Sequence, residues 1–224
     1  MGKYKVSVNQ LAEFDGASEA AKKRIISQQR KPDAFRIPWY QLPKARIKKC
    51  IALKGDLAPI HDAISILQAR KPTSPRQTND RNVSIEALTR FVEIKLPSII
   101  KNTDFEIIRP KSKTVAVKDV DIIVAPEIVV RGKVNGKTVI GGVKIHISKN
   151  SPFDLQKSKA VATIIYKYLK DEVATKDDAV LPELCFCLDV FDGRLVAAPE
   201  RVDATLKNIR EVCDEFKTIW DKTV

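Results

Sequence analysis

Residues 121–148 read DIIVAPEIVVRGKVNGKTVIGGVKIHIS, and this stretch decides the fold. Two apolar, strand-like segments, Asp121–Val130 and Thr138–Ser148, flank the pair Asn135-Gly136. A type I′ turn needs positive φ at both central residues, and Asn-Gly adopts it readily. The stretch therefore predicts a β-hairpin in which the numbers of paired residues sum to about 271.

Apolar periodicity on both sides of the hairpin predicts further helices and strands. Helical spacing follows Ser84, Ser151-Pro152 and Glu200, and short apolar runs typical of strands occupy Phe105–Ile108 and Leu184–Val190. This order predicts an α/β (α+β) protein, with an αβββαβ core around a mixed central sheet and a long C-terminal helix.

The N-terminal third differs from the rest in pattern and in charge. Residues 1–70 read as short helices, residues 71–84 hold two prolines and no periodicity, and residues 85–224 carry the predicted core. We therefore expect a basic helical N-terminal region, a linker and an α/β core. Residues 1–80 hold 16 Lys and Arg against 7 Asp and Glu, while the net charge of the whole chain is +12.

Basic side chains gather on two of the predicted N-terminal helices. They are Lys22, Lys23, Arg24, Lys44, Arg46, Lys48 and Lys49. A concentrated positive surface attracts phosphate backbones through the release of counterions, so we expect a nucleic-acid partner, with DNA favoured. A solvated basic face without a partner, or an acidic protein or membrane surface as the partner, are the alternatives.

Two further features of this region bear on nucleic-acid binding. The stretch Leu11–Ser18 is similar to the first helix and turn of helix-turn-helix DNA-binding proteins, and a second helix would extend to Arg30. A DNA-binding regulator that uses these helices is therefore one alternative. Trp39 and Tyr40 are able to stack on bases, although such aromatics more often pack a connecting segment onto a core.

Lys144 lies in the middle of a predicted strand, where an ammonium group needs water or a charge partner. Side chains alternate across a strand, so Lys144 shares one face with Gly142 and His146. Asp119 and Asp121 share a face of the preceding strand. Strict pairing places position 127 opposite Lys144, so a bulge or twist would be needed to bring Asp121 and Lys144 together.

This arrangement resembles the PD-(D/E)XK nuclease superfamily over residues 84–191. The resemblance rests on the αβββαβ order, on Asp121 at the start of a strand and on Gly142-Val143-Lys144 in the next strand. It implies a Mg²⁺-dependent nuclease in which Asp121 is a metal ligand and Lys144 is the catalytic lysine that orients the attacking water. A role in mobile-element, phage or defence biology suits the family.

The chain departs from the family pattern at Gly142, where the family has Glu or Asp. Loss of a carboxylate weakens a Mg²⁺ site, because this ion prefers several oxygen ligands. Candidate replacement ligands are Asp119, Glu86, Glu93, Asp154 and Gln156. His146 is a candidate metal ligand or base. Without a replacement, the core would be a catalytically inactive nuclease-like binder, and Asp121 with Lys144 would form a structural ion pair.

The composition limits the remaining function classes. No apolar run approaches the roughly 18–20 residues that span a bilayer. The N-terminus lacks the apolar segment of an export signal, and Cys185 and Cys187 read as small core residues, so we expect a reducing cytoplasm. A non-catalytic protein-interaction scaffold, with a protein partner or as a homodimer, is the second alternative.

Overall fold

The computed structural model describes residues 3–31 and 39–223, and it confirms the predicted α+β fold. The helices are α1 Val8–Phe14, α2 Glu19–Arg30, α3 Gln41–Ala52, α4 Ala58–Ala69, α5 Pro75–Val92, α6 Ser98–Asn102, α7 Leu155–Tyr168 and α8 Asp203–Lys222, with a π-helical turn, η1 Leu169–Val173, after α7. The strands are β1 Tyr4–Ser7, β2 Phe105–Ile107, β3 Thr114–Val117, β4 Val120–Ile123, β5 Ile128–Val134, β6 Lys137–His146, β7 Ala179–Asp189 and β8 Arg194–Ala197.

The predicted hairpin forms the centre of a five-stranded sheet with the order β2-β5-β6-β7-β8. Asn135 has φ 50° and Gly136 has φ 77°, so both turn residues adopt the positive φ that the type I′ turn requires. Val134 pairs with Lys137 and Ile128 pairs with Val143, which confirms the predicted register. β6 then runs parallel to β7, so the sheet is mixed, as expected.

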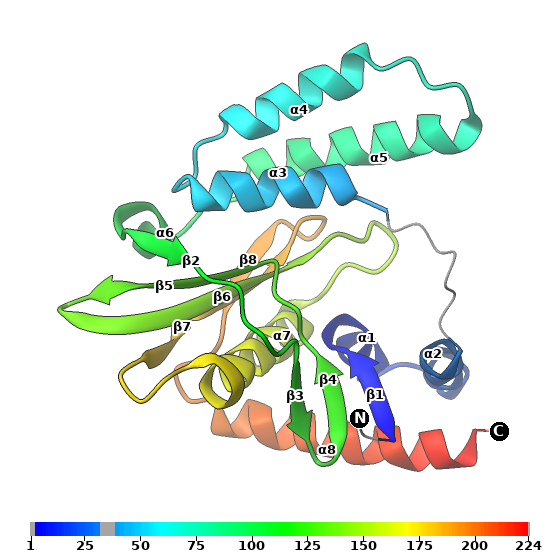
Figure 1. Cartoon of the computed structure of the whole chain (residues 1–224). Helices are drawn as coiled ribbons and strands as arrows, with labels where there is room; N and C mark the ends of the chain where they lie inside the picture. Colours follow the sequence, from blue (N-terminus) through cyan, green and yellow to red (C-terminus); the bar gives the residue numbers. More distant parts are fainter. Residues whose placement is uncertain (1–2, 32–38, 224) are drawn as a thin grey trace.

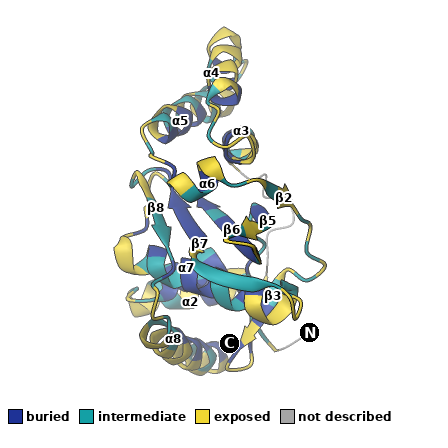
Figure 2. Cartoon of the chain, turned by 90° about the vertical axis from the view of Figure 1, so that its left-hand side faces the viewer, coloured by how far each residue is buried: buried dark blue, intermediate teal, exposed yellow. Residues whose placement is uncertain are grey.

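Helices cover both faces of this sheet (Figure 1). α3, α4 and α5 lie on one face, where Val143 and Ile145 of β6 join their apolar core. α7 lies on the other face, where Ile140 of β6 packs in a second core with Cys187 of β7 and Ile165 of α7. Figure 2 shows the central strands buried between these helix layers. Alternate residues of β6 therefore serve two different cores, and Lys144 belongs to the α7 side.

A second sheet joins the N-terminal segment to the rest of the chain. β1 runs parallel to β4, with Val6 opposite Ile122, and β3 completes the order β1-β4-β3. α1 contacts α7, and α2 contacts α8, so these helices share the apolar core on the α7 side. The predicted region 1–70 is therefore not helical throughout, and its first part is built into the core.

The strand expected at Asp121–Val130 is wrong, because the chain forms two strands there, β4 and β5, in different sheets. The break lies at Val124–Glu127. Pro126 has no N–H to donate to a strand neighbour, and Ala125 has φ 39°, which extended strands do not adopt. The chain uses this break to pass from the small sheet to the large one.

The linker expected at 71–84 is also largely wrong, because α5 begins at Pro75. The Ser74 hydroxyl caps the helix by accepting the Gln77 N–H, and proline fits the first helical turn, where its missing N–H costs nothing. The fully buried residues of α5 all lie in its second half, from Ser84 to Phe91. The exposed first half carries no apolar period, so the sequence pattern missed it.

In the part of the chain that the structure describes, none of the helices combines the length and the apolar character that a membrane crossing requires.

Candidate functional site

Lys144 of β6 meets a glutamate that lies directly before the first residue of β5. Its Nζ donates to the Ala125 carbonyl at 2.8 Å and lies 3.6 Å from Glu127 Oε1. The Lys144 side chain is 12% exposed, so it is nearly withdrawn from water and depends on these partners. Hairpin pairing ends at Ile128 with Val143, and Glu127 is the next residue opposite Lys144.

The Glu127 carboxylate provides a hydrogen-bond acceptor to the last part of β6, which extends beyond its pairing with β5. Its Oε2 accepts the Ile145 N–H at 2.7 Å, an amide that the shortened β5 no longer pairs. Its Oε1 lies 3.4 Å from Lys44 Nζ, which reaches in from α3. One carboxylate therefore holds two ammonium groups, one from each side of the sheet. We call Lys44, Glu127 and Lys144 the lysine–glutamate cluster.

Burial lowers the pKa of Lys144 below the ordinary lysine value of 10.5. Glu127 acts in the opposite direction, because a nearby negative charge favours the ammonium form, while the Lys44 charge adds to the lowering. Desolvation is the larger effect, so the folded protein binds this proton less tightly than an unfolded chain would.

Asp121, the expected metal ligand, does not join this cluster. It lies on β4 in the three-stranded sheet, opposite Lys5 of β1. Its strand neighbour Ile122 is fully buried, so alternation places the Asp121 side chain on the other face of that sheet. The acid against Lys144 is Glu127, which sequence reasoning did not single out. The register had pointed to it, since position 127 is the strict partner of Lys144.

The other expected acidic ligands also lie apart from Lys144. Asp119 follows β3 in the turn before β4; its side chain is 90% exposed, and its carboxylate is 3.9 Å from Lys217 Nζ. Glu86 on α5 pairs with Lys149 at 2.7 Å, and this hydrogen bond lowers the pKa of Glu86. Glu93 is the exposed residue that ends α5. These acids therefore serve separate surface positions.

Gly142, the position of the missing acid, is tightly surrounded on the α7 side. A Cβ there would lie 3.2 Å from Ile165 Cγ2, 3.3 Å from the Ile128 carbonyl and 3.4 Å from Leu169 Cδ1. The space that a carboxylate would occupy is therefore filled by apolar side chains of α7 and η1. Restoring the family pattern at this residue would bury a charge among hydrocarbon groups.

The residues present do not fit a Mg²⁺ site. This ion takes several oxygen ligands, whereas two ammonium groups and one amide N–H already occupy the oxygens of Glu127. Within residues 3–31 and 39–223, no three His, Cys, Asp or Glu side chains lie together in a way that could hold a metal ion. Asp154 caps α7 by accepting the Lys157 N–H, and Gln156 is exposed in the same turn. The geometry is that of an ion-paired cluster.

His146, the expected base or metal ligand, is buried in a hydrogen-bonded network. Its Nε2 lies 2.8 Å from the Ser151 carbonyl and therefore carries the proton, which leaves Nδ1 to accept from Asn9 Nδ2 at 3.3 Å. The ring stacks on Phe153 with centroids 3.6 Å apart. Asp189 Oδ2 lies 3.8 Å from Nε2 and accepts the Phe153 N–H. His146 thus joins β6, β7, α1 and the segment before α7.

Burial also lowers the pKa of His146 below its ordinary value of 6.5. The Ser151 carbonyl and the Asp189 carboxylate act in the opposite direction, since both favour the protonated ring. The ring is 5% exposed, and both of its nitrogens have partners. This environment suits a neutral, positioning histidine.

A groove of about 1100 Å³ opens beside the cluster, between the start of α1, the start of α3 and the first half of α5. The segment after β6 completes its lining. The side chains that offer cations, amides and aromatic rings are Lys44, Lys149, Asn9, Asn79, Asn150, Trp39 and Tyr40. None of the described residues that line the groove is acidic. Lys44 belongs both to this lining and to the lysine–glutamate cluster.

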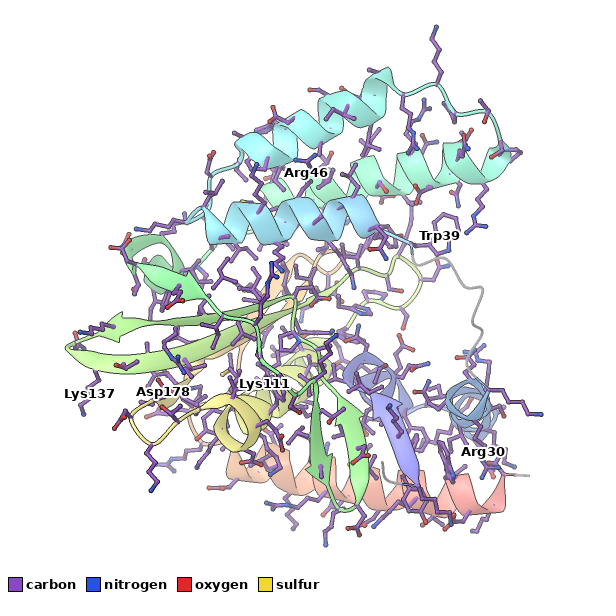
Figure 3. All side chains as sticks on the ribbon, viewed as in Figure 1. Arg30, Trp39, Arg46, Lys111, Lys137 and Asp178 are labelled. Atoms are coloured by element: carbon purple, nitrogen blue, oxygen red, sulfur yellow. The ribbon has the colours of Figure 1, made fainter. Side chains whose placement is uncertain are left out.

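The basic residues expected on α3 do not form one surface. Lys44 lines the groove. Arg46 is two residues away, about 200° around the helix, and Figure 3 places it between α3 and α4. Lys48 and Lys49 are exposed. Only Lys44 of this set therefore reaches the groove.

The basic residues expected on α2 are mostly engaged within the chain. Lys22 pairs with Glu215 of α8 at 2.6 Å, and Lys23 pairs with Glu19 one turn earlier at 3.2 Å. Arg24 is exposed. α1 and α2 do form two helices joined by a turn, as expected, but α2 packs against α8. Whether these helices read DNA stays a prediction.

A comparison with protein-family models finds no match for this chain, and a comparison with curated proteins finds none. The function proposed next therefore rests on the groove and the lysine–glutamate cluster.

Proposed function

We propose that this chain binds nucleic acid, with DNA favoured, in the groove between α1, α3 and α5. The observation that supports the proposal is the lining of the groove, which holds Lys44, Lys149, amides and aromatic rings. None of the described lining residues is acidic, and each lysine pairs with an acid outside the lining, Lys44 with Glu127 and Lys149 with Glu86. The lysines would contact phosphates, and the amides would donate to and accept from base edges. The overall charge of +12 would draw a polyanion toward the molecule.

The lysine–glutamate cluster supports this role through its charge. Two lysines face one glutamate, so basic side chains outnumber acidic ones in the cluster. Lys144 is nearly buried, whereas the Lys44 side chain is 32% exposed and lines the groove. Glu127 would therefore be a positioning residue that holds Lys44 in the lining of the groove. Lys144 would offset the negative charge of the Glu127 carboxylate.

A nuclease-like core is part of the proposal, in its catalytically inactive form. The hairpin strand that carries Gly142-Val143-Lys144 is the part of the structure on which this proposal rests. The acid opposite Lys144 is Glu127, not the expected Asp121. The apolar contacts around Gly142 and the occupied oxygens of Glu127 favour binding without a metal-dependent step at the cluster.

The test is the affinity for fluorescently labelled oligonucleotides, measured by anisotropy at one fixed salt concentration. The double variant Lys44→Gln, Lys149→Gln removes both groove lysines, and we expect it to weaken binding about ten-fold, as the loss of two phosphate contacts predicts. The matched control is Lys133→Gln, Lys137→Gln, which removes equal charge from exposed residues beside the hairpin turn, and Figure 3 places Lys137 far from Trp39.

Equal losses in the two double variants would show a response to net charge alone and would contradict the proposed groove. No detectable binding by the unaltered chain at low salt would contradict the function itself. Plasmid cleavage with Mg²⁺ that depends on Glu127 or Lys144 would show that the inactive form is the wrong choice.

A further inference from the structure

We infer that the ligand of the groove is single-stranded nucleic acid, one base of which stacks on Trp39. This inference rests on the proposed function and names its ligand class. The observations that carry it are the exposure of Trp39, its position between two hollows and the distribution of cations around it.

Trp39 is a large aromatic side chain that the fold does not bury. It is 38% exposed, whereas Trp220 is 8% exposed and packs against Phe216 and Tyr4 in the core. The adjacent Tyr40 does pack inward, edge to face with a phenylalanine ring of the β7–β8 turn. The chain therefore uses Tyr40 to anchor the start of α3 and leaves the Trp39 indole available to a ligand.

A second hollow, of about 490 Å³, shares Trp39 with the groove. Arg70, Arg76 and Gln77 line it together with one acid, Asp80. Trp39 lines both spaces, so the indole borders each of them. Cations line both spaces: arginines in the second hollow, and lysines in the groove.

Arg76 adds a second element of a stacking site. Its guanidinium carbon lies 5.8 Å from the centroid of the Trp39 ring. The guanidinium lies over the indole ring, so a phosphate-binding charge and a base-stacking ring occur at one place, which is the combination that proteins use for single strands. A phosphate on Arg76 would bring the neighbouring base toward Trp39.

The geometry favours a single strand over a duplex because of what each offers to the indole. The bases of a duplex stack on one another and expose only their edges, except at the ends. The bases of a single strand can leave the stack and expose their faces. The side-chain amides of Asn79 and Asn150 in the groove would then form hydrogen bonds with the unpaired edges of the same bases.

The experiment uses the fluorescence of the chain's two tryptophans. Base stacking quenches an exposed indole, so we expect a single-stranded 12-mer to quench the emission of Trp39. The Trp39→Phe variant retains only the buried Trp220, and its emission should stay unchanged on binding. A blunt duplex of the same sequence should bind at least ten-fold more weakly to the unaltered chain and cause little quenching.

Two variants of Trp39 separate stacking from folding. Trp39→Ala should lose about ten-fold in affinity for the single strand, and Trp39→Phe should lose less, because a phenyl ring still stacks. Both should unfold at nearly the same denaturant concentration as the unaltered chain, since Trp39 belongs to neither apolar core.

The outcomes distinguish this inference from the proposed function. Equal affinity for duplex and single strand, with Trp39 emission unchanged, would overturn the inference while leaving nucleic-acid binding in place. Binding that survives Trp39→Ala without loss would also overturn it. Failure to bind either ligand would overturn the proposed function and the inference together.

Discussion

Glu127 and Lys144 face each other at the point where the β5–β6 hairpin stops pairing, with Oε1 and Nζ 3.6 Å apart. The carboxylate also accepts the Ile145 N–H and meets Lys44 from α3. A single acid thus accepts a hydrogen bond from a backbone amide of β6 and pairs with two lysines, the nearly buried Lys144 and Lys44 of the groove. The stability of this region and the position of Lys44 both depend on it.

Replacing Glu127 tests that dependence. Glu127→Ala leaves the Lys144 ammonium and the Ile145 N–H without their acceptor, so we expect the free energy of unfolding to fall by about 2–4 kcal/mol. Glu127→Gln keeps an oxygen for the amide and should cost about half as much. Urea denaturation measures both. Glu93→Ala, at an exposed acid, is the control and should stay within about 0.5 kcal/mol of the unaltered chain.

The pH dependence of stability tests the burial of Lys144. Burial depresses the pKa of Lys144 in the folded state, so the unfolded chain binds more protons between that pKa and 10.5. The free energy of unfolding gained from this group therefore rises with pH across this window, by at most about 1.4 kcal/mol per pH unit. The Lys144→Met variant has no ionisable group at this position and therefore lacks this pH-dependent contribution. The difference between the two proteins, measured by urea denaturation, should favour the lysine protein increasingly as the pH rises from the folded pKa of Lys144 to 10.5.

A constant difference across that range would contradict a buried, charged Lys144. The other lysines titrate in both proteins, so their contributions cancel in the comparison.

Gly142 offers a test of the inactive-nuclease interpretation. Gly142→Asp restores an acid to the family pattern, but its carboxylate would lie against Ile165 and Leu169, so we expect a loss of about 3 kcal/mol in unfolding free energy. Gly142→Ala adds only the close Cβ and should lose about 1 kcal/mol. If Gly142→Asp instead kept its stability and gained Mg²⁺-dependent cleavage, the cluster would be a metal site that lacks one ligand.

The stability should also fall in acid through His146. Its folded pKa lies below 6.5 because the ring is buried, so the neutral ring stabilises the fold above 6.5, and this contribution is lost as the pH falls through the folded pKa. We expect His146→Gln to show a weaker acid dependence in thermal unfolding. His61→Gln, at an exposed residue of α4, is the control. An acid dependence that is identical in the His146 and His61 variants would contradict the buried network.

The sequence predicted the elements whose signals are local. Asn135-Gly136 set the hairpin and its register, and the apolar period after Glu200 marked α8, which begins at Asp203. The first half of α5 was missed because it is exposed on most sides and therefore carries no apolar period. The small sheet was missed because its β1–β4 pairing joins segments more than 100 residues apart, and no local pattern reports such a contact.

The candidate site was predicted in part, and the reason lies in one broken strand. Lys144 was singled out correctly as a strand lysine that needs a partner, and its partner is an acid. Asp121 was expected as a metal ligand because the resemblance to the PD-(D/E)XK superfamily implies an acid at the start of the strand before Lys144. Pro126 and the positive φ of Ala125 break that strand and leave Glu127 at the hairpin end. Tertiary contacts, not sequence spacing, then placed Lys44 beside it.

The most direct test of the central claim is the salt dependence of single-strand binding. The logarithm of the binding constant should fall linearly with the logarithm of salt concentration, and Lys44→Gln, Lys149→Gln should reduce the slope by about 2. The control pair Lys133→Gln, Lys137→Gln should leave the slope unchanged. A slope that is the same in the groove variant and in the unaltered chain would contradict nucleic-acid binding in the groove.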